Sequence, residues 1–340
     1  MNIVFGVIIG FFILMALVVA HEFGHFIAAR RSGVEVEEFG IGFPPRAKAW
    51  IMNPEYIAWK KAKKSGKKPG KKPKKWLKLQ KSEWDKKQKT LVFSINYLPI
   101  GGFCQMKGES DSDKRPHSFG QATLWQKTKI LFAGVAMNWL VAFIILTVLS
   151  ITGMPEFMEN QFHMPGDSAE AKVDIDEQYY IPVTRSTWSA PIVGAVTTVQ
   201  LTGETYRGLF NMLTSLGSGI VKQFNPDESI RNEGQAEIKD AGDSVSGPVG
   251  IIGIIFPKSF ESGPTTLAFL AALISISLAC MNVLPIPALD GGRFIMIAFY
   301  RLRGKVLTKE KEEKLVARTF IFLLILIAIV TILDVTRFFR

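Results

Sequence analysis

Long apolar segments constrain this sequence more than any other feature. Three of them run from Ile3 to about Ile27, from Ile130 to Ile151 and from Thr319 to Leu333, and a less uniform fourth runs from Thr265 to Leu284. A helix needs ~20 such residues to cross a hydrocarbon core of ~30 Å. Hydrophobic residues make up 48% of the 340 residues, and because they are bunched rather than dispersed, they indicate a membrane protein instead of two soluble domains.

The first apolar segment predicts a retained helix. No basic residue precedes it and no small-residue cleavage site follows it, which argues against a signal peptide. Two further stretches, Gly33 to Phe43 and Thr90 to Gly102, have roughly alternating apolar residues and predict strands. We therefore predict an α-helical polytopic integral membrane protein with four transmembrane helices and a small membrane-associated β element.

The predicted parts follow one another along the chain. They are a transmembrane helix at 1–30, a cytosolic β element with a lysine-rich insertion at 31–126, a second helix at 127–152, an extracytosolic region with an amphipathic segment at 153–263, a third helix at 264–292, a cytosolic loop at 293–316 and a fourth helix at 317–336.

One lysine-rich segment supplies the basicity of the chain. Between Lys60 and Lys89 there are fifteen lysines and two acidic residues, whereas the whole chain has a net charge of +11. Such a segment can bind nucleic acid, but Pro and Gly interrupt it and no fold surrounds it, which favours a solvated loop near anionic lipid. We thus predict the lipid bilayer, and no nucleic acid, as its partner. By the positive-inside rule, the lysine-rich segment lies in the cytosol. The same rule places residues 153–246, which include fourteen acidic and six basic residues, outside.

The first apolar segment ends in "HEFGH", residues 21 to 25. Four residues apart on a helix, His21 and His25 project from one face and can reach a single Zn²⁺, while Glu22 lies beside them near a water on that metal. Ionisable groups in a membrane helix are costly, so they are seldom kept without a functional partner. The alternative is a helix end whose polar residues reach the cytosolic interface.

A hydrolytic zinc site needs a third protein ligand and leaves a fourth position to water. Cys104 and Cys280 are too few and too far apart for a thiolate site, so the ligands must be nitrogen and oxygen. Asp290 is the only carboxylate in or at the edge of the third predicted helix, at the end that we expect on the same side as His25. Its "LDGG" could be a simple turn, but together with "HEFGH" it indicates a metal site.

The two motifs "HEFGH" and "NVLPIPALDGG" resemble the signature motifs of the site-2 protease family of intramembrane zinc metalloproteases, in the bacterial branch with the regulator of sigma-E protease. Val135 stands where many relatives have Pro. Further similar stretches are "FGIGFPPR" (39–46), "YLPIGGFCQMKGE" (97–109), "LFAGVAMN" (131–138) and "SGPVGI" (246–251).

The resemblance implies a function and a set of site residues. His21, His25 and Asp290 would be the Zn²⁺ ligands, Glu22 the general base and acid, and Asn282 and Pro285 substrate-binding residues. The protein would be a multi-pass endopeptidase of the bacterial inner or plasma membrane, with its active site near the cytosolic side. It would cleave the transmembrane segments of single-pass membrane proteins in regulated intramembrane proteolysis.

Two expectations concern how substrate reaches the site. A substrate helix must be unwound before cleavage, and its freed backbone groups need new partners. We therefore expect the substrate to add as a strand to an exposed edge at Gly33–Phe43. The alternative is a sheet with a purely structural role.

Relatives in this branch carry one or two PDZ domains after the second helix. Residues 190–224 resemble the amphipathic segment that follows such a domain, and about Met154 to Ser189 is too short for one. We expect the PDZ domain to be missing.

Two other classes of protein could carry these motifs. A metal transporter would also place His and Asp in helices, but it should show polar residues along several helices rather than one compact cluster. An inactive scaffold of the same fold would usually have lost a ligand or the base, and all four residues are present.

Overall fold

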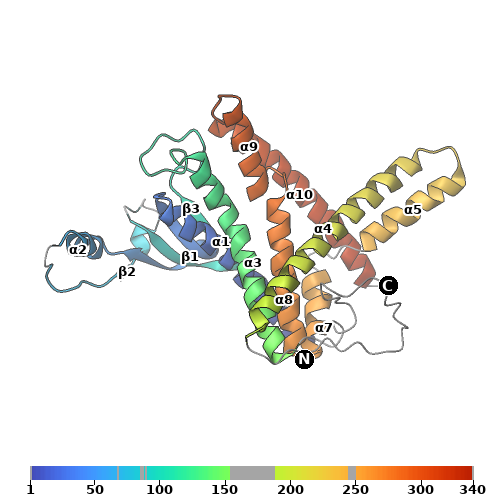
Figure 1. Ribbon diagram of the computed structural model, residues 1–340, viewed down its shortest axis with the longest axis horizontal. Helices are drawn as coiled ribbons and strands as arrows, with labels where there is room; N and C mark the ends of the chain where they lie inside the picture. The colour runs from blue at the N-terminus through green and yellow to red at the C-terminus, as the bar shows by residue number, and fades with distance from the viewer. Residues whose placement is uncertain are drawn as a thin grey trace. The chain divides into compact units, whose positions relative to one another are not determined.

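The chain is built mainly of helices (Figure 1), and the computed structural model describes residues 2–66, 69–84, 88, 90–153, 188–243 and 250–338. Within these residues, four helices are long and apolar enough to cross a membrane. They are α1 (Asn2–Arg31), α3 (Leu124–Thr152), α8 (Pro264–Val283) and α10 (Lys309–Phe338). The prediction of a helical chain with four membrane-length helices and a small sheet is confirmed.

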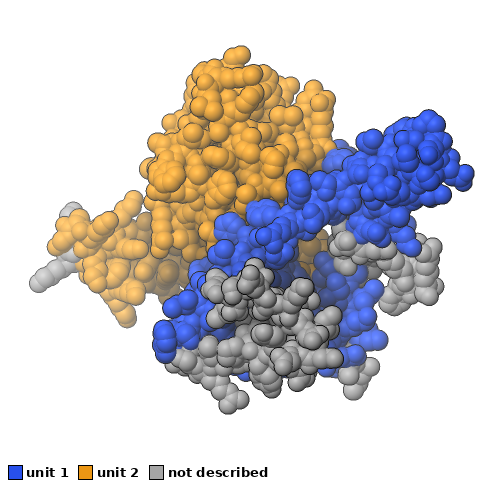
Figure 2. All heavy atoms as spheres, turned by 45° about the vertical axis from the view of Figure 1, so that its right-hand side comes forward, with its two compact units in different colours: residues 1–13, 139–280, 321–340 blue, residues 14–138, 281–320 orange. Residues whose placement is uncertain are grey.

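The chain divides into two compact units (Figure 2). We call residues 14–138 and 281–320 the site unit, because every residue predicted for the metal site or for substrate binding belongs to it. We call residues 1–13, 139–280 and 321–340 the helical unit.

The helical unit has an apolar core between α3 and α8. Ala142, Leu146, Phe269 and Ile276 are among its buried side chains, and Leu201 and Tyr206 of α4 (Ala190–Gln223) pack against it. Helix α4 covers the predicted amphipathic segment 190–224 and pairs with α5 (Glu228–Asp243), which is followed by the short η3 (Ile251–Ile255) and α7 (Phe256–Glu261). The prediction of a missing PDZ domain falls mostly on residues 154–187, outside the described residues.

The sheet of the site unit has three strands in the order β2-β1-β3, all antiparallel: β1 (Val36–Met52), β2 (Trp76–Lys78) and β3 (Val92–Met106). The two long strands pair along more than one stretch. The second half of β1 pairs with the first half of β3, as in Trp50 opposite Phe93, and the first half of β1 pairs with the second half of β3, as in Phe39 opposite Cys104.

The prediction that Gly33–Phe43 offers an exposed edge is wrong. Phe39 lies opposite Cys104 on one side and Phe93 on the other, and Gly40 lies opposite both Phe103 and Ser94. Residues 38–41 are therefore interior to the sheet, whereas residues 102–106 of β3 pair with β1 alone among the described residues. Alternating apolar residues predict a strand but not its neighbours, and here the chain folds back so that the second half of β3 forms the free edge.

A cluster of aromatic rings fixes α1 against this sheet. Phe26 of α1 lies with its ring centroid 5.4 Å from that of Phe39 and 5.6 Å from that of Phe93. Ile130 and Leu131 of α3 belong to the same buried core and are almost fully inaccessible to solvent. Each such side chain stabilises the fold by ~1.5–3 kcal/mol through burial. The turns of α1 that carry the two histidines are thus held by packing on both sides.

The composition of the lysine-rich segment predicts a loop, but part of the segment is helical. Pro54–Lys64 form helix α2, and the Trp59 indole N–H donates a hydrogen bond to the Gly70 carbonyl (2.8 Å). Lys63 and Lys72 place their ammonium groups 5.5 and 6.0 Å from the centre of the Trp59 ring. These cation–π contacts stabilise a defined structure in this part of the segment. A count of its charges alone does not predict that structure.

The predicted third helix, 264–292, is two helices. Helix α8 ends at Val283, and Asp290 begins α9 (Asp290–Leu302) after a turn that contains Pro285 and Pro287. Proline lacks the N–H that would continue a helix, so the break follows from the sequence. Helix α9 and the first residues of α10 also make most of the predicted loop 293–316 helical.

Candidate metal and active site

Helix α1 places His21 and His25 one turn apart, and both are buried, with 8% and 6% of their surfaces exposed. Their Nε2 atoms lie 3.1 Å apart. The Nδ1–H of His25 donates a hydrogen bond to the Ile130 carbonyl of α3 (2.8 Å). Since this bond fixes the proton on Nδ1, the Nε2 lone pair of His25 is available to a metal.

Asp290 completes a triangle of potential ligand atoms. Its Oδ2 lies 3.0 Å from His21 Nε2 and 3.2 Å from His25 Nε2. Ligand atoms at ~2.0–2.1 Å from a tetrahedral Zn²⁺ lie about 3.3 Å from one another. The three side chains therefore converge as one small ion requires. The structure brings the three predicted ligands together although Asp290 lies 265 positions after His25 in the sequence (290 − 25).

The turn before α9 sets the position of Asp290. The N–H of Ile286 donates to the Leu284 carbonyl and that of Leu289 to the Ile286 carbonyl, each at 2.8 Å. A Cβ on Gly291 or Gly292 would lie 2.1 or 2.0 Å from the carbonyl oxygen of Val283 or Ile286, so only glycine fits at either position. The turn can therefore fold tightly enough to point the Asp290 carboxylate at the histidines.

Glu22 lies beside the histidines, and one ligand atom from each of Glu22, His21 and His25 falls within 4.8 Å of the others. Its carboxylate is within hydrogen-bonding reach of the backbone N–H of Cys104, in the free edge of β3. Burial and the carboxylates of Glu22 and Glu109 raise the pKa of the Cys104 thiol far above its usual range. The Cys104 thiol is therefore neutral at physiological pH.

Two residues of α3 complete the site, and the sequence analysis gave neither a role. A Cβ on Gly134 would lie 2.5 Å from His25 Nε2 and 2.7 Å from His21 Nε2, so this glycine keeps open the space that a metal would use. The Asn138 amide lies 3.3 Å from His21 Nδ1. We expect its oxygen to accept the Nδ1 proton when His21 Nε2 holds a metal, since an asparagine amide can be flipped. Both residues belong to the "LFAGVAMN" stretch, so the motif was the available signal.

Comparison with known sequences identifies the family. The sequence model of peptidase family M50 matches residues 9–54 and 77–327, which include both site motifs. The chain belongs to peptidase family M50. The predicted site-2 protease family is thereby confirmed, as is the predicted class of enzyme, a metalloprotease of the site-2 type.

Two relatives of this M50 peptidase are distant in sequence but align with it over nearly their whole length. The regulator of sigma-W protease RasP of Bacillus subtilis is 26% identical, over 98% of this chain and 99% of its own. The zinc metalloprotease RasP of Bacillus licheniformis is also 26% identical, over 95% and 97%. Residues 55–76, with most of α2 and ten lysines, lie outside the family match.

The two predicted substrate-binding residues lie between the ends of α8 and α9. Asn282 is half-buried near the end of α8, and Pro285 is exposed in the following turn. Their contact with a substrate stays a prediction.

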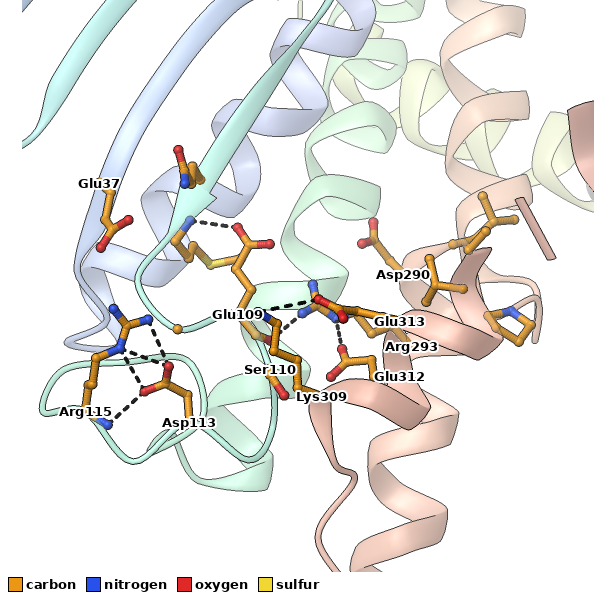
Figure 3. Close-up of a pocket in the computed structure, with 17 residues that line it drawn as sticks. Glu37, Glu109, Ser110, Asp113, Arg115, Asp290, Arg293, Lys309, Glu312 and Glu313 are labelled. Carbon is orange, nitrogen blue, oxygen red and sulfur yellow. Dashed lines mark hydrogen bonds and ion pairs between the residues drawn. The ribbon is translucent and has the colours of Figure 1, made fainter. Parts of the chain in front are cut away.

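A polar pocket of about 540 Å³ opens beside Asp290 in the site unit (Figure 3). Its walls come from Glu37 of β1, from the end of β3 and the loop after it (Gln105 to Arg115), and from the start of α9 and α10. The Asp290 carboxylate, which points to the histidines, also lines this pocket, so the pocket adjoins the metal site.

Proposed function

We propose that this chain is an intramembrane zinc endopeptidase of the bacterial inner or plasma membrane, with its active site near the cytosolic side. It would cleave transmembrane segments of single-pass proteins in regulated intramembrane proteolysis. The observation that carries the proposal is the convergence of His21, His25 and Asp290 within 3.2 Å, with Glu22 beside them. The two histidines and Glu22 belong to α1, which is long and apolar enough to span a membrane. The names of the RasP relatives support zinc, proteolysis and a role in sigma-factor regulation.

The chemistry follows from these side chains. When bound, Zn²⁺ lowers the pKa of water to ~7 and polarises the scissile carbonyl. Glu22 accepts the proton of the attacking water and returns it to the leaving amine. The Ile130 carbonyl and the Asn138 amide hold the rings of His25 and His21 so that each presents Nε2.

The free edge of β3 is the proposed place for the substrate backbone. Alternate residues of a strand direct their backbone groups to the same edge. The N–H of Cys104 reaches Glu22, and the N–H of Met106 donates to Glu109 Oε1 (2.9 Å) rather than to β1. Gly102, Cys104 and Met106 therefore present their backbone groups to an added strand, which would pass beside Glu22. Asn282, with Pro285 next to it, would hold backbone groups freed from the unwound substrate helix.

The extracytosolic region is proposed to lack a PDZ domain. The alignment with the Bacillus subtilis relative spans 444 positions, so at least 104 of them (444 − 340) have no residue of this chain. That shortfall is at least as large as the 80 to 100 residues expected of one PDZ domain from the family resemblance. A filter against large extracytosolic substrate domains would then be absent.

Replacing the proposed base separates chemistry from metal binding. Glu22→Gln should keep zinc and lower cleavage of a single-pass substrate by at least ~10²-fold, because it preserves the shape of the side chain but cannot carry the proton. Zinc per protein and cleavage in detergent are the two measurements. Glu35→Gln is the matched control, since Glu35 is an exposed partner of Lys107 and should keep both properties. Full cleavage by Glu22→Gln would refute the mechanism.

The strand geometry has its own test on the substrate. Methylating backbone nitrogens one at a time around the cut removes single hydrogen-bond donors. An added strand predicts that kcat/KM falls at alternate residues, because only those face the edge of β3. Losses without this alternation would refute addition to the sheet.

A further inference from the structure

The first turn of α9 carries Asp290 but has few side chains that could hold it in place. Two glycines, Gly291 and Gly292, follow Asp290 directly, and Leu289 at the N-cap makes no side-chain capping hydrogen bond. Glycine offers no side chain to pack and loses more conformational freedom in a helix than any other residue, so such a turn is weakly held by itself. The only other side chain in this turn is that of Arg293.

The Arg293 side chain binds two other segments of the site unit. Its Nε–H donates a hydrogen bond to Glu312 Oε1 of α10 (2.9 Å), and its Nη2 group donates one to the Glu109 carbonyl in the loop after β3. In Figure 3 the guanidinium lies between Glu109 and Glu312. Its central carbon also lies 5.0 Å from the centre of the Phe119 ring, which is fully buried.

The partners of Arg293 are themselves held. Glu312 is only 6% exposed, and the Glu109 side chain accepts the N–H of Met106 (2.9 Å) at the end of β3. A guanidinium is planar and directs its donors in fixed directions, so it restricts the turn more than a flexible ammonium group would. Arg293 therefore ties the start of α9 to the start of α10 and to the loop that follows the free edge of the sheet.

This anchor lies close to the third predicted ligand. Arg293 is three residues after Asp290, which is about 4.5 Å along the helix axis. The Asp290 carboxylate must stay within about 0.2 Å of its place to bind the same zinc ion as His21 and His25. We infer that Arg293 is a positioning residue, which holds the first turn of α9 so that Asp290 points at the two histidines. This inference rests on the proposed function, in which Asp290 is a zinc ligand.

A second arginine of α9 offers a matched control. Arg301 Nη2 lies 3.0 Å from Asp111 Oδ1, in the same loop that Arg293 contacts, and the two arginine side chains are similarly exposed, at 31% and 22%. Arg301 is eleven residues after Asp290 (301 − 290), about 16 Å along the axis. If the arginines only join α9 to the loop, losing either one should affect the metal site equally. If Arg293 positions Asp290, only its loss should do so.

The test measures zinc affinity of the full-length protein in detergent by competition with a chelator. Arg293→Met should weaken zinc binding by about 10-fold, the lower end of the range for partners of metal ligands, because Arg293 acts on Asp290 through a turn of helix rather than by a direct bond. Arg293→Lys keeps the charge but cannot hold both acceptors, so it should lose about 3-fold. Arg301→Met should keep the affinity of the unchanged protein.

Cobalt provides a readout that a loss of stability alone would not change. The visible absorption of Co²⁺ bound in place of zinc reports the number and the geometry of its ligands. The spectrum of Arg293→Met should differ from that of the unchanged protein, whereas the spectrum of Arg301→Met should not. Thermal unfolding of the metal-free proteins gives the stability that each variant loses, and the metal is titrated at a temperature at which all of them are folded.

The outcomes separate this inference from the proposed function. Unchanged zinc affinity and an unchanged cobalt spectrum in the Arg293 variants would refute the positioning role. Equal losses in Arg293→Met and Arg301→Met would assign the effect to a general loosening of α9 against the loop and would equally refute it. Failure of the unchanged, zinc-loaded protein to cleave a single-pass substrate would instead count against the proposed function.

Discussion

Adding one methyl group at Gly134 should remove the metal from this site. The Cβ of Gly134→Ala would lie 2.5 Å from His25 Nε2, and ordinary contact begins at 3.4 Å, so the ring must retreat by at least 0.9 Å (3.4 − 2.5). Zinc–nitrogen bonds of ~2.0 Å tolerate deviations of only ~0.2 Å. His21 must move as well, since its Nε2 would lie 2.7 Å from the same Cβ. Losing a group that merely orients a ligand costs 10- to 100-fold in metal affinity, so we expect a loss of about 100-fold or more.

The assay is a zinc titration against a competing chelator, read together with cleavage and thermal unfolding. Overpacking a buried position costs ~1–3 kcal/mol, whereas Ala gains only ~0.5–1 kcal/mol over Gly in a helix, so metal-free Gly134→Ala should unfold somewhat earlier than the metal-free unchanged protein. Zinc is therefore titrated at a temperature at which both proteins are folded. Gly208→Ala is the matched control, since a Cβ there meets nothing within 4 Å, and it should keep zinc and activity. Unchanged zinc affinity in Gly134→Ala would show that α3 does not pack over the histidines as described.

Three further changes test other parts of the structure. Asp290→Ala should lower zinc per protein because it removes a ligand atom, and unchanged stoichiometry would show that the third ligand is another residue. Lys127→Met should lower the free energy of unfolding by about 3 kcal/mol, because it breaks a fully buried ion pair with Asp111. The double variant Lys127→Met/Asp111→Leu should have a free energy of unfolding closer to that of the unchanged protein. If Lys127→Met were as stable as the unchanged protein, the argument would be wrong. Replacing residues 60–75 with a Gly/Ser linker should leave cleavage in detergent nearly intact. It should weaken binding to anionic vesicles by ~1 kcal/mol for each lysine near the surface. A loss of cleavage with normal zinc content would instead place this segment in the substrate path.

The sequence could predict the parts of the site that follow from local geometry. The spacing of His21 and His25 determines which face of a helix they share, and that spacing needs no knowledge of the rest of the fold. Asp290 is predictable as a third ligand because it is the only carboxylate at its end of the third apolar segment. The break at Pro285 and Pro287 was also predictable, since proline cannot continue a helix.

Features that depend on packing between distant segments were not predictable. The free edge of the sheet depends on how β1 and β3 fold back, which the alternation within Gly33–Phe43 does not encode. The role of Gly134 depends on how closely α3 approaches α1, and a glycine in an apolar helix carries no sign of that distance. The pocket beside Asp290 brings together Glu37, Glu109 and Glu312, which are far apart in the sequence. The two residues on each side of Glu312 include two acidic and two basic ones, so its sequence neighbours do not indicate an acidic pocket.

The position of α2 has a consequence for how proteins of this kind diversify. Met52 and Trp76, which bracket α2 and the first ten lysines of the lysine-rich segment, are direct partners in the β1–β2 ladder. A segment whose two ends already meet can lengthen, shorten or be exchanged while both strands keep their register, because its closure costs little more as it grows. Evolution can therefore try new attachments at this hairpin one after another while the hydrolytic centre stays under constant selection.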